Sequence, residues 1–122
     1  MGNNNKFLIV TILKELFSDL LIASGAVVTG PVVSLLFGSG KWSTNTIDLS
    51  LMDCTIAKAV SDQIRSMLSD RIIDEAMTNS GPIFVIKGNL TGEPLSIRLD
   101  TQTAVSDTKI KNFLGIIMRV AV

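Results

Sequence analysis

One stretch of about thirty residues, Ser50 to Asn79, constrains the fold more than any other part of the sequence. Apolar side chains recur in it every four residues, and flanking apolar positions widen the stripe to one face of an α-helix. Gly81-Pro82 follows as a stop signal, because proline cannot continue a helix. The pattern predicts a long central amphipathic helix. Its buried face comprises Ile56, Ala57, Val60, Ile64, Met67, Leu68, Ile72, Ile73 and Ala76.

Two short segments after this helix predict a β-hairpin. Pro82 to Lys87 is apolar without alternation, as in a strand that is buried on both faces. Leu95 to Asp100 alternates apolar and polar residues, as in a strand with one wet face. The connection between them is rich in glycine, asparagine and proline, which is typical of turns. We therefore expect the two segments to pair as antiparallel strands.

Helices are also predicted near both ends of the chain. The first runs from Lys6 to about Ala23, after Asn5 as a capping residue, and has only a narrow polar stripe. The last runs from Thr108 to Val120, although Gly115 costs it roughly 1 kcal/mol relative to alanine. A chain of 122 residues can bury one core and is too short for two.

Together these elements predict an α+β fold in a small single domain that spans residues 1–122. Its expected order is an N-terminal helix, a buried apolar segment, the long central helix, the β-hairpin and a C-terminal helix.

The apolar segment from Leu20 to Gly40 carries no charged residue and is long enough to span a membrane. Gly30-Pro31 would interrupt a spanning helix in mid-segment. We therefore expect short buried strands at Ala26–Val28 and Val32–Phe37, and membrane contact is the lesser alternative.

The loop from Gly38 to Trp42 invites comparison with a phosphate-binding loop, since it follows an apolar run and contains glycines and Lys41. The motif would need its first glycine at Leu35 and serine or threonine in place of Trp42. A flexible glycine-serine loop is the simpler interpretation. A small ligand-binding module built on this loop remains one alternative function.

Composition argues against catalysis. The chain has no histidine, which removes most acid-base chemistry near neutral pH, and its single cysteine, Cys54, excludes an internal disulfide and a thiolate metal cluster. Asp70, Asp74 and Glu75 lie close in sequence, but their pattern is that of a solvated helix face. We therefore predict no catalytic, cofactor-binding or metal-ligating residues, and no enzyme.

Charge and hydropathy suggest a role in assembly. Eleven basic and eleven acidic residues give a net charge of zero, so no long-range field attracts nucleic acid. The chain is 47% hydrophobic, and its mean hydropathy of +0.46 exceeds what a small monomer easily hides. We predict a non-enzymatic structural or assembly subunit that self-associates, such as a component of a virion, tube or shell. The main alternative is a small dimeric regulatory or adaptor domain.

The expected partners are copies of the chain or other protein subunits, with no nucleic acid, no cofactor and no identified small-molecule substrate. The expected location is the cytoplasm or a virion rather than the secreted fraction. The candidate interface residues are Phe7, Leu13, Phe17, Leu20, Val33, Phe37 and Trp42.

Overall fold

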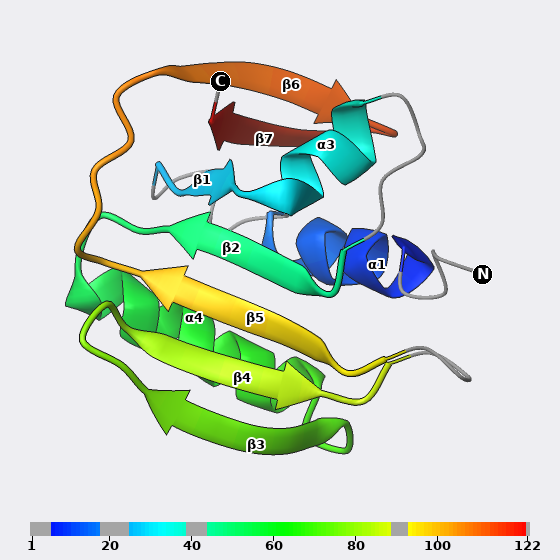
Figure 1. The fold of residues 1–122 in the computed structure, drawn as a ribbon, viewed down its shortest axis with the longest axis vertical. Helices are drawn as coiled ribbons and strands as arrows, with labels where there is room; N and C mark the ends of the chain where they lie inside the picture. The colour runs from blue at the N-terminus through cyan, green and yellow to red at the C-terminus, as the bar shows by residue number, and fades with distance from the viewer. Residues whose placement is uncertain (1–5, 18–24, 39–43, 89–92, 122) are drawn as a thin grey trace.

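The computed structural model describes residues 6–17, 25–38, 44–88 and 93–121, which form a twisted sheet with helices packed against it (Figure 1). The elements in chain order are α1 (Lys6–Leu16), β1 (Val27–Thr29), α3 (Pro31–Phe37), β2 (Thr46–Ser50), α4 (Cys54–Met67), β3 (Ile72–Met77), β4 (Pro82–Ile86), β5 (Leu95–Asp100), β6 (Thr108–Phe113) and β7 (Ile116–Ala121).

The sheet is seven-stranded and mixed, with the order β3-β4-β5-β2-β1-β7-β6. Two pairs are parallel, β2 with β5 and β1 with β7, and the other neighbours are antiparallel. Both parallel pairs join segments that lie far apart in the sequence. The centre of the sheet is therefore assembled from distant parts of the chain.

The hydrophobic core lies between the sheet and helices α1 and α4, which stand behind the strands in Figure 1. Ile47 and Leu49 of β2, and Ile97 of β5, are fully buried in it. Ile12 of α1 and Ile64 of α4 belong to the same core. Burial of one such side chain is worth about 1.5–3 kcal/mol relative to its exposure. The alternate residues of the central strands therefore fix which side of the sheet faces the helices.

The polar alternates of β2 and β5 point to the other side of the sheet, because successive strand residues face opposite ways. They are Thr46, Asp48 and Ser50 of β2, and Ser96, Arg98 and Asp100 of β5, each paired in register with its counterpart. Each is half-buried or exposed. This open side of the sheet is the polar surface considered below.

The predicted long central helix is wrong in its second half. Helix α4 begins after Asp53, whose Oδ1 accepts a 3.0 Å hydrogen bond from the Ile56 N–H, and it ends at Met67. The chain then turns, with the Arg71 N–H donating to the Leu68 carbonyl, and continues as edge strand β3. Most of β3 is exposed. An edge strand with little burial shows no clear alternation, so the helical period appeared to continue through it.

The predicted C-terminal helix is also wrong, because this segment forms the hairpin of β6 and β7. Leu114 and Gly115 occupy the turn with φ of 53° and 89°, the backbone region that two-residue hairpin loops require. Gly115 is thus a turn residue and not a costly helix position. In β7, Ile116, Met118 and Val120 are buried and alternate with exposed neighbours.

The apolar segment is strand at Val27–Thr29, but the predicted strand at Val32–Phe37 is wrong, because it lies in helix α3. Pro31 stands in the first turn of α3, where its fixed φ suits a helix and its missing N–H is not needed. The described part of the first helix runs from Lys6 to Leu16. Among the described residues, no helix is long and apolar enough to cross a membrane.

Strands β4 and β5 pair antiparallel at the predicted segments, but both are inner strands of the large sheet and not an isolated hairpin. The predicted α+β arrangement around a long central helix is therefore wrong as a whole. The observed architecture is a mixed sheet with α1 and α4 on one side. The expectation of one domain over residues 1–122 stays a prediction.

Candidate functional site

The best-defined polar contact on the open side of the sheet joins Asp48 and Arg98. The Arg98 Nε donates to Asp48 Oδ1 at 2.6 Å, and Nη2 donates to Oδ2 at 3.1 Å. These residues are neighbours only because β2 and β5 pair in parallel and in register. Two parallel N–H···O bonds between a guanidinium and a carboxylate fix orientation as well as charge. Arg98 is therefore held in one direction by Asp48.

The two side chains differ in exposure, and this difference assigns their roles. The Asp48 side chain is 17% exposed, whereas that of Arg98 is 48% exposed. The carboxylate thus lies against the sheet, and the guanidinium reaches the solvent. Asp48 uses two N–H groups of the guanidinium. A guanidinium carries five such donors, so others remain for a ligand.

Gly30, at the turn from β1 into α3, lies directly against the Asp48 carboxylate. A Cβ added to Gly30 would stand 2.5 Å from Asp48 Oδ2, and the φ of Gly30 is 77°. Both the close approach and the left-handed backbone favour glycine at this position. The Thr46 hydroxyl stands 3.5 Å from the same Oδ2 atom. The carboxylate is therefore enclosed by β2, β5 and the β1–α3 turn.

The hydrogen bond with Asp48 raises the pKa of Arg98, partial burial lowers it, and the charge of Asp48 raises it again, so that the net shift is upward. The guanidinium therefore stays cationic at every pH at which the protein folds. The site is therefore an exposed guanidinium of fixed charge and orientation, paired with one carboxylate on the polar side of the sheet.

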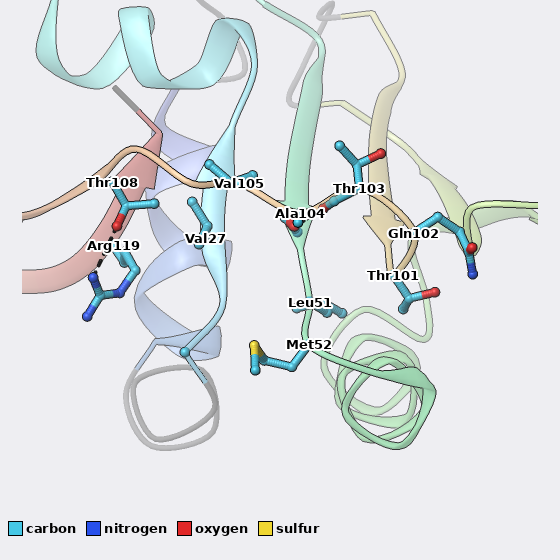
Figure 2. Close-up of a pocket in the computed structure, with 12 residues that line it drawn as sticks. Val27, Leu51, Met52, Thr101, Gln102, Thr103, Ala104, Val105, Thr108 and Arg119 are labelled. Atoms are coloured by element: carbon cyan, nitrogen blue, oxygen red, sulfur yellow. Dashed lines mark hydrogen bonds between the residues drawn. The ribbon is translucent and has the colours of Figure 1, made fainter.

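A pocket of about 300 Å³ lies at the carboxyl ends of β2 and β5. Ser50, which lines it, follows Asp48 of the Asp48–Arg98 pair by two residues along β2. Residues 101–107, which we call the strap, leave β5 and cross in front of β2 and β1 to reach β6 (Figure 2). The Ser50 hydroxyl donates to the Thr103 carbonyl at 2.9 Å and ties the strap to β2. The pocket lies beneath this tie.

Asp100 shapes the strap and does not point a free carboxylate into the pocket. Its Oδ1 accepts the backbone N–H groups of Gln102 and Thr103 at 2.8 and 3.1 Å. Burial raises the pKa of Asp100, but these hydrogen bonds and one from the Thr103 side chain outweigh it and lower the pKa. The carboxylate is therefore ionised at neutral pH and is occupied by the turn.

Arg119 of β7 lies at the end of the pocket opposite Thr101 and Gln102 (Figure 2). Its Nη1 donates to the Thr108 hydroxyl at 3.1 Å. Among the described residues, no carboxylate forms an ion pair with Arg119. The residues that line the pocket include no aspartate or glutamate. Arg119 thus supplies an uncompensated positive charge to a pocket rich in hydroxyl groups.

The predicted interface residues fall in different places. Leu13 and Phe17 are buried in the core, Val33 and Phe37 are partly buried against it, and Phe7 is exposed. Leu20, Trp42 and most of the Gly38–Trp42 loop lie outside the described residues. The structure does not bring the described ones, Phe7, Leu13, Phe17, Val33 and Phe37, into one surface, and the role of all seven at an interface stays a prediction.

The site residues were missed because no strand was predicted at Thr46–Ser50. The signal was present in the sequence: Thr46, Asp48 and Ser50 alternate with Ile47 and Leu49, which is the pattern of a strand with one wet face. The pairing of this strand with Leu95–Asp100, and the pairing of Arg119 with Val27, depend on the sheet order. No local pattern predicts them.

Comparison with solved structures relates this fold to nucleotidyltransferase-like proteins. The chain is similar to JHP933 from Helicobacter pylori, with a TM-score of 0.63 and 17% identity over 98% of this chain and 51% of that one. MenT4, a nucleotidyltransferase toxin from Mycobacterium tuberculosis, gives a TM-score of 0.62 and 12% identity over 98% and 49%. An antigenic nucleotidyltransferase-like protein from Paracoccidioides brasiliensis gives 0.53 and 15% over 91% and 61%.

The TM-scores show a shared fold, and at these low identities they show the fold alone; the chain spans about half the length of JHP933 and MenT4. No protein-family model matches the sequence, and no curated protein matches it either. The neighbours contradict the prediction of a non-enzymatic structural or virion subunit, because they include a nucleotidyltransferase-like protein and a nucleotidyltransferase toxin. The expectation that the chain is not an enzyme is corrected on the same ground.

Polymerase-type transfer reactions commonly use two divalent cations that carboxylates bind at close spacing. In the described part of the chain, no three aspartate, glutamate or cysteine residues gather in a group that could hold a metal ion. Both oxygens of Asp48 accept hydrogen bonds from Arg98. The described residues therefore do not fit a prebuilt two-metal centre, and the chemistry they offer is recognition of an anion by a clamped arginine.

Proposed function

We propose that this chain is the sheet domain of a nucleotidyltransferase-like protein and that it binds the phosphates of a nucleoside triphosphate through Arg98. The observation that carries the proposal is the forked contact between Arg98 and the nearly buried Asp48 on the open side of the sheet. The nucleotidyltransferase-like neighbours support the choice of ligand, because each shares this fold over most of the present chain.

The geometry suits phosphate recognition for two reasons. A guanidinium binds phosphate oxygens with paired N–H donors, and an arginine that a carboxylate already orients loses less conformational entropy on binding. Gly30 lies beside the pair and is exposed, so the backbone there presents no side chain to a phosphate that approaches Arg98. Asp48 acts as a positioning residue, and Arg98 is the group that contacts the ligand.

The test is titration of the purified chain with ATP, CTP, GTP and UTP by calorimetry, for the wild type and for Arg98→Gln. Loss of a charge-assisted contact of about 1.5–3 kcal/mol should weaken binding by about 10- to 150-fold. Arg65→Gln is the matched control, since Arg65 also contacts carboxylates, Asp62 and Glu75, but lies on helix α4. Its nucleotide affinity should equal that of the wild type.

Circular dichroism and thermal melting would show that the variants remain folded. Wild-type protein that binds none of the four nucleotides, or equal affinity of wild type and Arg98→Gln, would contradict the proposal. Release of pyrophosphate from the same nucleotides, measured with and without Mg²⁺, asks separately whether the chain also supports transfer.

A further inference from the structure

We infer that the pocket beneath the strap binds a phosphate group of the acceptor substrate, the molecule that would receive the nucleotide. This inference rests on the proposed function, because it places the second substrate of the proposed transfer reaction on the same open side of the sheet. It starts from Arg119, which the Asp48–Arg98 pair does not involve.

The pocket has the charge that a phosphate requires. Among the described residues that line it, Arg119 is the only charged one, and the rest of the polar lining consists of hydroxyl, amide and backbone groups. Asp100, which precedes the strap, is engaged by the Gln102 and Thr103 backbone N–H groups. Asp107, within the strap, does not line the pocket and forms no ion pair with Arg119 among the described residues. A phosphate that entered the pocket would therefore meet a cation and hydroxyl donors without an opposing negative charge.

The guanidinium is held in a defined position. Its single described hydrogen bond, to the Thr108 hydroxyl, fixes Nη1 and leaves other N–H donors for a ligand. Thr108 and Arg119 lie on neighbouring strands of the β6–β7 hairpin, so the contact is part of the fold. Figure 2 shows the pair at one end of the pocket and Gln102 and Thr101 at the other end.

The pocket also lies at a suitable position relative to Arg98. Ser50, which lines it, follows Asp48 by two residues on the same side of β2, or about 7 Å along the strand. Arg119 of β7 pairs with Val27 of β1, and Val27 pairs with Ser50 of β2. The backbone of Arg119 therefore lies two strands, or about 10 Å, from the backbone of Ser50. One phosphate at Arg98 and another at Arg119 would therefore belong to two neighbouring molecules on one surface.

Apolar residues give the pocket a second kind of contact. Val27, Leu51 and Met52 form part of its wall beneath the strap. A ligand with a phosphate and a flat or apolar remainder, such as a nucleotide, matches this combination better than a free inorganic anion. The phosphate can come from a mononucleotide or from the backbone of an oligonucleotide, and the experiment separates these sources.

The test is calorimetric titration in EDTA, without nucleoside triphosphate, with three probes: AMP, adenosine, and a six-nucleotide single-stranded RNA without terminal phosphates. AMP or the RNA should bind the wild type, and adenosine should bind at least tenfold more weakly. Arg119→Gln should weaken the binding of that probe about tenfold or more. Lys109→Gln, which removes the same charge from an exposed site on β6 that does not line the pocket, should leave it unchanged.

The two sites are distinguished by testing each variant with the ligand of the other site. Arg119→Gln should retain ATP affinity, and Arg98→Gln should retain affinity for the acceptor probe, so failure of one proposal does not imply failure of the other. Stronger response to RNA than to AMP would assign the phosphate to a polynucleotide acceptor. Binding of neither probe, equal loss in Lys109→Gln, or loss in Arg98→Gln but not in Arg119→Gln would overturn the inference.

Discussion

Gly30 shows how a single hydrogen atom in place of a side chain permits the candidate site to form. Gly30→Ala should place a methyl group against the Asp48 carboxylate and also strain the backbone at φ 77°. Gly25→Ala is the matched control, because Gly25 has a φ of 76° but no atom within 4 Å of its added Cβ. We expect Gly30→Ala to lower the free energy of unfolding by about 1 kcal/mol or more beyond the control.

Urea denaturation of the two variants measures that difference directly. Gly30→Ala should also weaken ATP binding, because the displaced carboxylate no longer orients Arg98. Equal stability and equal ATP affinity of the two variants would show that the Gly30 contact with Asp48 does not matter.

For single residues, some roles could be predicted from the sequence and others could not. Ser50 or Asp53 suits the start of the central helix by residue type, and the structure shows that Asp53 caps α4. Asp48 gave no comparable signal, because its partner lies 50 residues away and only the sheet brings the two together. Arg119 was a helix residue in the prediction and is a strand residue in the fold, so the pocket could not have been found.

Helix α4 is the element whose burial pattern the sequence describes best. Ile64 is fully buried, and its neighbour Gln63 is exposed. Ile64→Asp places an unpaired carboxylate in the core and should cost several kcal/mol, enough to unfold the chain. Gln63→Asp adds the same charge to the solvated face and should change the stability by no more than about 0.5 kcal/mol.

Thermal melting followed by circular dichroism distinguishes the two. Arg65→Ala should have a small effect, since its contacts with Asp62 and Glu75 are exposed ion pairs. Similar melting temperatures for Ile64→Asp and Gln63→Asp would mean that the faces of the helix have been assigned wrongly.

Besides the inner strand β2, the sequence patterns failed to predict the edge strands β3 and β6 and the strand β7 beside β6. Strand β3 is almost entirely exposed, and β6 shows little burial, so neither displays the alternation that marks a strand with one buried face. Strand β7 does alternate, but Ile116 and Ile117 together with Val120 also fit a helical period. Length and alternation therefore predicted the inner strands β4 and β5 correctly, whereas β3, β6 and β7 were assigned to helices.

At the scale of the whole molecule, apolar surface remains on the β6–β7 hairpin. Ile110, Leu114 and Ile117 are 59%, 83% and 49% exposed, and β6 is an edge strand of the sheet. Exposed apolar groups beside an unpaired edge favour association. We expect the weight-average mass to rise with concentration, and Ile117→Lys to reduce that rise.

Sedimentation velocity over a concentration series measures the effect, with Gln63→Lys as the control for the added charge. A wild-type mass that stays constant from micromolar to millimolar concentration would contradict this expectation. Homo-oligomerisation was predicted from the high hydrophobic content, the neutral net charge and the lack of catalytic groups, and it stays a prediction until this measurement is made.

The order of the strands also sets the order in which the molecule can be completed during synthesis. A nascent chain that has emerged only as far as Ile86 can pair β1 with β2 and β3 with β4, but these pairs share no strand. They become one sheet only when β5 inserts between β4 and β2, and such non-local closure is slow. Asp48 is therefore synthesised before its partner Arg98. Until β5 has been added, this position of the sheet presents an unpaired carboxylate, whereas the finished protein presents the guanidinium of Arg98 there.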